Sequence, residues 1–216
     1  MSTVPQPTGY KSPIAVSAIW LLALVASGIA PYDRPTWFLE VMPVLIAAPI
    51  LIATRATLPL TQLVYLLICI HGLILILGGA YTYARVPPGL WVQEWLDLDR
   101  NPYDRLGHLA QGFIPAIIAR ELLLRVFQIG RGKFLFFLVI SICLAISAFY
   151  ELIEWWTALL FGQGAHEFLG TQGDVWDTQW DMFLALVGAV LAQFTLSRLH
   201  DFQLARTAGG ASGRMV

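Results

Sequence analysis

The chain alternates between long apolar stretches and short segments that carry most of its charged residues. A helix needs roughly 20 mainly apolar residues to cross the hydrocarbon core of a bilayer, and several stretches approach or exceed that length. The pattern therefore predicts an all-α protein, a polytopic transmembrane helical bundle of about six spans. The predicted spans are residues 13–30, 37–53, 60–83, 106–126, 134–161 and 182–199.

The second predicted span contains Pro43 and Pro49. Proline removes a helix hydrogen bond, so either a kink or a partly re-entrant path is expected there. No repeat of 20–50 residues is evident in the sequence. Residues 1–216 are therefore predicted to form one integral membrane domain.

Two segments outside the spans have distinct patterns. Residues 84–101 form a long predicted outer segment whose stretch LWVQEWLDLD places Leu90, Trp91 and Trp95 near one helical stripe. This spacing is typical of a short helix in the interface plane, although an irregular aromatic loop fits the same length. Residues 201–216 end in TAGGASGRMV, a composition that predicts a flexible cytoplasmic tail.

Composition confirms the membrane assignment. The chain is 57% hydrophobic and only 12% charged, about half the charged fraction of a typical soluble domain. Cys69 and Cys143 both lie in apolar stretches, where buried thiols pack as small hydrophobes. The sequence contains no basic patch, so the expected partner is the lipid bilayer and not a nucleic acid.

The charged residues are distributed unequally between the two sides of the predicted bundle. An even number of spans places both termini on one side, and nine Lys and Arg residues lie on that side against four on the other. The positive-inside rule therefore predicts that both termini are cytoplasmic. Twelve of the fourteen acidic residues and seven of the eight tryptophans lie at or near the outer side. The acidic and aromatic residues are therefore concentrated at the outer end of the predicted bundle.

Three carboxylates precede the last span in the stretch GDVWDTQWDM. Asp174, Asp177 and Asp181 are spaced i, i+3 and i+7, which places them within about 60° of one another on a helix that begins near Asp174. If the helix instead begins at Thr178, Asp177 becomes its N-cap. Charge beside hydrocarbon is unfavourable, so these acids need a partner, a cation or water.

Two other predicted helices bring polar groups to the same depth. Asp104 and His108 share one face of the fourth span with Gln111, and Glu151 and Glu154 lie i, i+3 near the outer end of the fifth. Arg105 is a candidate to neutralise one carboxylate. The candidate metal ligands are Asp104, His108, Glu151, Glu154, Asp174, Asp177 and Asp181, with Glu151 also the candidate general base.

This donor set indicates a divalent metal whose identity the sequence leaves open. Oxygen ligands with one imidazole suit Zn²⁺, Mn²⁺ or Fe²⁺, and oxygen ligands alone suit Mg²⁺ or Ca²⁺. Two alternatives explain the same cluster: a hydrated, hydrogen-bonded structural network, and protonated carboxyls along a proton or ion path.

The remaining polar residues allow simpler interpretations. Glu121 and Arg125 are spaced i, i+4 as in a helix-surface ion pair, and Arg120 is placed to reach the inner headgroups. His71 lies in mid-span, where it is either a packing histidine or a relay. His166, with Glu167 beside it, could cover the acidic cluster or lie in a solvated loop.

Three stretches resemble the YjdF-like family of bacterial inner-membrane proteins: NPYDRLGHLAQGFIPAIIARELLLR, FYELIEWW and FLGTQGDVWDTQWDMFLALVGA. They cover the second half of the chain. The resemblance implies a small multi-pass protein of the bacterial inner membrane. It supplies no catalytic residues, so the roles of the acidic positions rest on their chemistry.

Three functions fit these observations, and the sequence leaves open whether the protein is an enzyme. The first is an outward-facing metal site that acts on a lipid or a membrane-proximal substrate. The second is transport of an ion, proton or small solute through the bundle. The third is an accessory role in a homo-oligomer or larger membrane complex, for which the small-residue stripe of Gly188 and Ala192 would permit close helix contact.

Overall fold

The computed structural model describes residues 12–162 and 166–212, and all regular secondary structure within these residues is helical. Each predicted span corresponds to one long helix, so the prediction of an all-α helical bundle is confirmed. The long helices are α1 (Ser12–Gly28), α2 (Arg34–Thr54), α3 (Gln62–Tyr81), α5 (Tyr103–Arg125), α6 (Lys133–Phe161) and α8 (Asp177–Ser212). The short ones are η1 (Tyr83–Arg85), α4 (Pro87–Leu96) and α7 (His166–Leu169).

Among the described helices, α2, α3, α6 and α8 are long and apolar enough to cross a membrane. Helix α1 is apolar but shorter, with 17 residues. Helix α5 is long enough, with 23 residues, but it is less apolar because it contains polar and charged residues such as Asp104, His108 and Arg120. The chain is therefore a multi-pass membrane protein.

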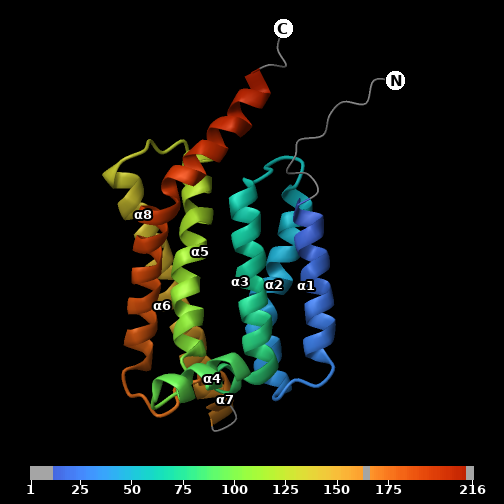
Figure 1. Cartoon of the computed structure of the whole chain (residues 1–216), viewed down its shortest axis with the longest axis vertical. Helices are drawn as coiled ribbons and strands as arrows, with labels where there is room; N and C mark the ends of the chain where they lie inside the picture. Colours follow the sequence, from blue (N-terminus) through green and yellow to red (C-terminus); the bar gives the residue numbers. More distant parts are fainter. Residues whose placement is uncertain (1–11, 163–165, 213–216) are drawn as a thin grey trace.

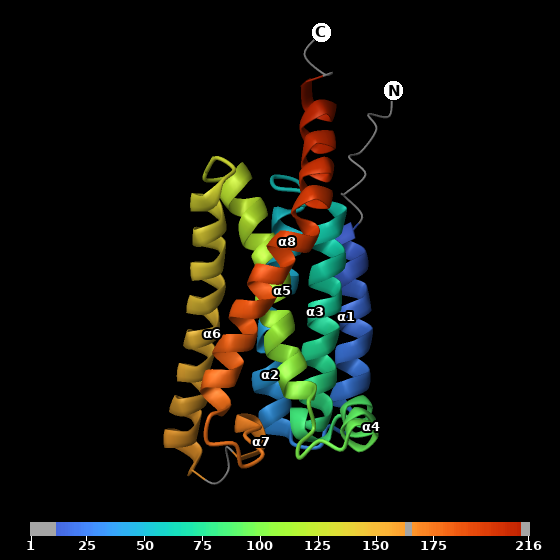
Figure 2. The same cartoon turned by 60° about the vertical axis from the view of Figure 1, so that its left-hand side comes forward.

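The long helices lie side by side, as Figures 1 and 2 show, with α4 and α7 gathered at one end of the bundle. The start of α1 and the C-terminal part of α8 lie at the opposite end. Helices α1, α2 and α3 pack together, and so do α5, α6 and α8, while α3 packs against α5 and joins the two groups.

The closest crossing in the bundle joins α5 to α8. An added Cβ atom on Gly112 would lie 1.9 Å from the carbonyl oxygen of Ala185, and one on Gly188 would lie 2.2 Å from that of Leu109. Only glycine permits this approach. The small-residue stripe that includes Gly188 and Ala192 thus packs within the chain itself, and it brings the start of α8 against the start of α5.

Helix α1 packs against α3 through a tryptophan ring that lies over a glycine. The ring of Trp20 lies where a side chain on Gly72 would have to stand, and its Nε1 donates a hydrogen bond of 3.1 Å to the carbonyl oxygen of Cys69. Cys69 and Cys143 are free thiols, and Cys143 is buried in the core as predicted.

Three segments can be compared with the sequence-based expectations. Helix α2 runs as a single helix through Pro43 and Pro49, without a re-entrant break. A short helix, α4, forms within the segment 84–101. Residues up to Ser212 of the segment predicted to be a flexible tail continue α8, while residues 213–216 lie outside the described part of the chain.

Candidate metal centre

Arg100 organises the acidic cluster at the α4–α7 end of the bundle. Its guanidinium is buried, donates a hydrogen bond of 2.9 Å to Asp104 Oδ2, and makes a second, shorter one to Asp177 Oδ1. It also donates to the carbonyl oxygen of Gly170 at 3.3 Å. Burial alone would lower the pKa of Arg100, but the hydrogen bond and charge of Asp177, together with Asp104, raise it above its ordinary value. Arg100 therefore stays charged and ties α5 to α8.

Asp174 pairs with the second arginine of this end. Arg105 Nη2 lies 3.0 Å from Asp174 Oδ2, which confirms the prediction that Arg105 neutralises one carboxylate. Helix α8 begins at Asp177, so Asp174 precedes it, and its Oδ1 accepts the backbone N–H of Trp176 at 2.9 Å. Arginine pairing therefore accounts for both Asp174 and Asp177.

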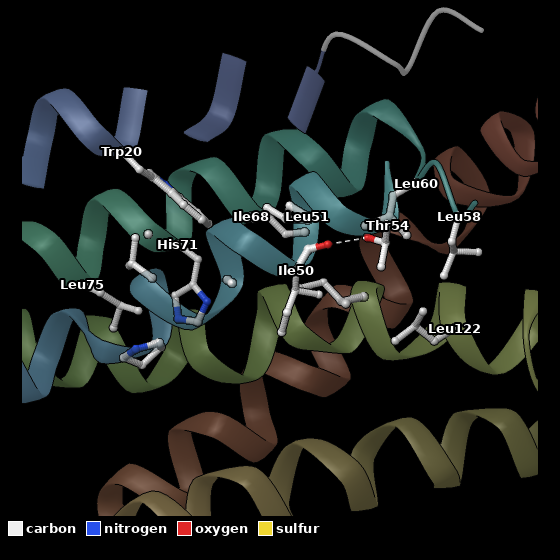
Figure 3. Close-up of a pocket in the computed structure, with 15 residues that line it drawn as sticks. Trp20, Ile50, Leu51, Thr54, Leu58, Leu60, Ile68, His71, Leu75 and Leu122 are labelled. Atoms are coloured by element: carbon white, nitrogen blue, oxygen red, sulfur yellow. Dashed lines mark hydrogen bonds between the residues drawn. The ribbon is translucent and has the colours of Figure 1, made fainter. Parts of the chain in front are cut away.

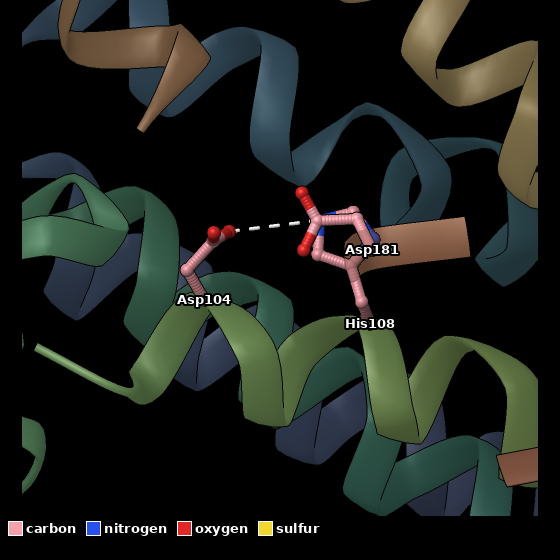
Figure 4. A group of neighbouring side chains, drawn as sticks. All are labelled: Asp104, His108 and Asp181. Carbon is pink, nitrogen blue, oxygen red and sulfur yellow. Dashed lines mark ion pairs between the residues drawn. The ribbon is translucent and has the colours of Figure 1, made fainter. Parts of the chain in front are cut away.

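Three of the predicted ligands converge beneath these ion pairs. His108 Nε2 lies 3.6 Å from Asp104 Oδ1 and 3.7 Å from Asp181 Oδ2 (Figure 4). One donor atom from each residue lies within 4.8 Å of the other two, and all three side chains are buried. The two distances from Nε2 exceed a normal N–H···O hydrogen bond.

The other nitrogen of His108 faces an amide. His108 Nδ1 lies 3.0 Å from Gln111 Oε1, a carbonyl oxygen that can only accept, so Nδ1 carries a proton. In the neutral ring Nε2 then presents a lone pair toward two carboxylates. That arrangement is unfavourable unless Nε2 binds a proton or a cation.

Helix α6 adds Glu151 and Glu154 to the cluster. Glu151 Oε1 lies 4.0 Å from His108 Nδ1, and one donor atom each from His108, Glu151 and Glu154 can form a second group within 4.8 Å. Within the described residues, Glu151 Oε1 and Asp181 Oδ1 are enclosed without a hydrogen-bond partner. A buried acceptor in that state destabilises the fold unless another group occupies the site.

Sequence reasoning missed Glu40 as a member of this site. Its side chain is 4% exposed and its Oε2 accepts a hydrogen bond of 3.1 Å from the Tyr150 hydroxyl. A pocket of about 140 Å³ joins Glu40 to Asp104, His108 and Glu154. The signal was a carboxylate inside the second predicted span, where a charge is unfavourable without a partner.

The opposite end of the bundle holds a second polar cluster, and two sequence interpretations there are wrong. Glu121 pairs with Arg125 as predicted, at 2.6 Å, but Glu121 is fully buried and the pair is not on the helix surface. Arg120 is also buried, with 5% exposure, and donates to Asp201 and His200 in place of reaching toward headgroups. Both side chains are buried because they bind partners from other parts of the chain, which the i, i+4 spacing does not reveal.

This second cluster is a closed network. Glu121 accepts hydrogen bonds from the hydroxyl of Thr61 at 2.7 Å and from His200 Nε2 at 2.9 Å. Arg120 Nη1 lies 2.8 Å from His200 Nδ1; since arginine only donates, Nδ1 accepts and the proton of His200 lies on Nε2. The network joins α5, α8 and the α2–α3 loop, which is a structural role.

Two other predicted positions lie outside these clusters. His71 is not part of either ion-pair network but lines the 140 Å³ pocket, and its Nε2 has no hydrogen-bond partner in the described part of the chain. The side chains of His166 and Glu167 lie outside the described part, so their covering role stays a prediction.

The chain is similar to known proteins along most of its length. A family profile with the description "Predicted membrane protein (DUF2238)" matches residues 13–202. "Inner membrane protein YjdF" of Escherichia coli (strain K12) is 56% identical over 185 residues, which cover 86% of this chain and 88% of that protein. No solved structure matches the chain. The resemblance seen in the sequence motifs is therefore confirmed.

Proposed function

This chain belongs to the DUF2238 family of predicted membrane proteins, and we propose that it binds a divalent cation between Asp104, His108 and Asp181. Like its Escherichia coli relative, it is a protein of the bacterial inner membrane. The cation would lie in a buried pocket at the α4–α7 end of the bundle, where it could act on a lipid or another substrate at the membrane surface.

The spacing around His108 Nε2 is the observation that carries this proposal. With bond lengths near those of Zn²⁺ to nitrogen and oxygen, neighbouring ligand atoms of a tetrahedral site lie roughly 3.3–3.5 Å apart. The distances from His108 Nε2 to Asp104 Oδ1 and Asp181 Oδ2 are 3.6 and 3.7 Å. They are long for hydrogen bonds, and shifts of a few tenths of an ångström would suit a shared metal ion.

Two further features support a metal at this position. The hydrogen bond between His108 Nδ1 and Gln111 Oε1 is the kind of outer contact that fixes the tautomer of a metal-binding histidine. Asp181 Oδ1 and Glu151 Oε1, both without partners among the described residues, supply acceptor atoms for the cation or for water bound to it.

A bound cation makes a coordinated water more acidic. A metal held by Asp104, His108 and Asp181 would supply this chemistry, and Glu151 would be the proton acceptor, because its Oε1 lies 4.0 Å from His108 Nδ1 and has no hydrogen-bond partner among the described residues. Glu40 and Tyr150 line the same pocket and would contact the substrate. Arg100 has a positioning role, since it holds Asp104 in place through Oδ2.

We also propose that all six long helices cross the membrane and that both termini are cytoplasmic. The common position of the start of α1 and the end of α8 supports an even number of crossings (Figure 1). The excess of Lys and Arg on that side supports the orientation. Helix α4 would then lie along the outer interface, where Trp91 and Trp95, 69% and 82% exposed, would enter the headgroup region.

Metal analysis of the protein purified in mild detergent tests the site. We expect about one Zn²⁺ or Mn²⁺ per chain after incubation with the ion and removal of excess, as one closed site implies. His108→Ala and Asp181→Asn should each lose it. Asp174→Asn is the matched control, because Asp174 pairs with Arg105 and is not in the ligand set. Equal metal content in all four proteins would reject the ligand assignment, and a metal-free wild type would favour a protonated His108.

A further inference from the structure

An apolar cavity of about 420 Å³ lies between α2, α3 and α5 (Figure 3). Its walls include Val44 and Leu51 from α2, Ile68 from α3, and Ile118 and Leu122 from α5. The hydroxyl of Thr54, also in the wall, is already used, since it donates a hydrogen bond of 2.7 Å to the carbonyl oxygen of Ile50. A cavity with such walls stays dry and favours hydrocarbon over hydrated ions.

This cavity adjoins the pocket of the candidate metal centre. Pro43, His71 and Leu75 line both the apolar cavity and the 140 Å³ pocket that contains Asp104 and His108. The two spaces therefore adjoin, with the polar pocket on one side of these three residues and the apolar cavity on the other. A ligand that fills both must be amphipathic.

The apolar cavity also reaches the lipid-facing surface of the bundle. Ile50 lines it while 54% of its side chain is exposed, and Pro43 is exposed as well. Leu45 and Ile46, next to them on α2, are exposed apolar residues that would contact lipid chains. A hydrocarbon chain could thus enter from the bilayer without crossing water.

We propose that the cavity takes one acyl chain of a membrane phospholipid whose head group lies in the polar pocket. Only the head-group position rests on the proposed metal site; the chain position rests on the cavity alone. An apolar cavity of roughly 150 Å³ holds one benzene, so about 420 Å³ has room for roughly 17 carbon atoms. The wall from Pro43 to Thr54 extends roughly 16 Å along α2, about half the hydrocarbon thickness of a bilayer.

Photocrosslinking in vesicles tests the chain position. The protein is reconstituted in vesicles of phosphatidylethanolamine and phosphatidylglycerol that contain a phosphatidylethanolamine with a diazirine near the end of one acyl chain. Labelled positions are then mapped by mass spectrometry. We expect labelling of Ile118 and Leu122 in the wall formed by α5. Ala47→Trp, which fills the cavity from α2, should reduce this labelling by about fivefold or more.

Ile46→Trp is the matched control, because the neighbouring side chain faces outward with 53% exposure, and it should leave the labelling of α5 unchanged. Leu122→Trp fills the cavity from the opposite wall and should reduce labelling of Ala47 and Leu51, which gives a second test if Ala47→Trp does not fold. Labelling equal to the wild type on the α5 wall of Ala47→Trp and on the α2 wall of Leu122→Trp would overturn the proposal.

A further variant separates this proposal from the metal site. Asp181→Asn should lose metal but keep the acyl-chain label, because Asp181 does not line the apolar cavity. Loss of metal without loss of labelling supports both assignments. Normal metal binding with no label on the α5 wall would reject the acyl-chain site alone, and normal labelling with no metal in any protein would reject the metal site alone.

Discussion

Asp181 on α8 faces His108 on α5 with 3.7 Å between Oδ2 and Nε2, and the two helices make their closest approach directly below this pair. The approach depends on glycine backbone at Gly112 and Gly188, where a methyl group would overlap a facing carbonyl oxygen. The distance between a carboxylate and an imidazole is thus controlled by two residues that carry no functional group.

Gly112→Ala should widen this crossing. The new Cβ atom would stand 1.9 Å from the carbonyl oxygen of Ala185, so α8 must move and Asp181 must withdraw from His108. We expect a loss of stability of about 2 kcal/mol or more, measured by thermal unfolding in detergent, together with lower metal content. Gly130→Ala is the matched control, because nothing lies within 4 Å of its added Cβ atom. Normal metal binding by Gly112→Ala would contradict the coupling between crossing and site.

Replacing Arg100 should be far more damaging than replacing Arg105. Arg100→Gln leaves Asp104 and Asp177 buried without their cation, and breaking a buried ion pair in this way costs about 3–5 kcal/mol. Arg105→Gln removes a pair whose arginine is 37% exposed, and such pairs contribute about 1 kcal/mol or less. Urea or thermal unfolding of both variants measures the difference. Equal destabilisation would show that Arg100 is not the organising cation of the cluster.

Glu121→Gln should destabilise the protein without changing its metal content. Both carboxylate oxygens of Glu121 accept hydrogen bonds from Thr61, and an amide would direct N–H groups at donors in a fully buried position. We expect a loss of about 3 kcal/mol, as for a broken buried charge pair. Asp201→Asn, at a position whose side chain is 34% exposed, should have a smaller effect. A large loss of bound metal in a folded Glu121→Gln protein would connect the two ends of the bundle.

Removal of the metal should lower the thermal stability of the wild type. A ligand that binds only the folded state stabilises it, by about 2.7 kcal/mol at a concentration one hundred times its dissociation constant. Treatment with a chelator should therefore reduce the unfolding temperature, and addition of Zn²⁺ or Mn²⁺ should restore it. Asp181→Asn should show neither response. A wild type that responds no more than this variant would argue against a stabilising metal.

Local patterns in the sequence were sufficient for the helices and for part of the cluster. The i, i+4 spacing of Asp104 and His108 and the i, i+3 spacing of Glu151 and Glu154 placed each pair on one face, and the structure keeps each pair together in a potential donor group. The sequence did not predict which carboxylates pair with arginine and which lie beside His108. Which carboxylate Arg100 selects depends on the approach of α5 to α8, a relationship between residues 77 positions apart.

The same limit explains the misread residues near the opposite end. Arg120 looked like a headgroup contact because its own helix offers no partner for it, whereas its partners His200 and Asp201 arrive from α8. Glu40 was overlooked because its partner Tyr150 lies on α6. In each case the polar group has a satisfactory environment that exists only after distant helices have packed.

Because the chain is synthesised from its N-terminus, α8 is the last long helix to reach the membrane. A ribosome delivers α5 to the membrane well before α8, so for that interval Arg100, His108 and Arg120 lack the partners that Asp177, Asp181 and Asp201 later provide. Nascent or truncated chains that end before α8 would hold unpaired charges within the bilayer, and proteases and chaperones that survey the inner membrane could recognise them by that defect.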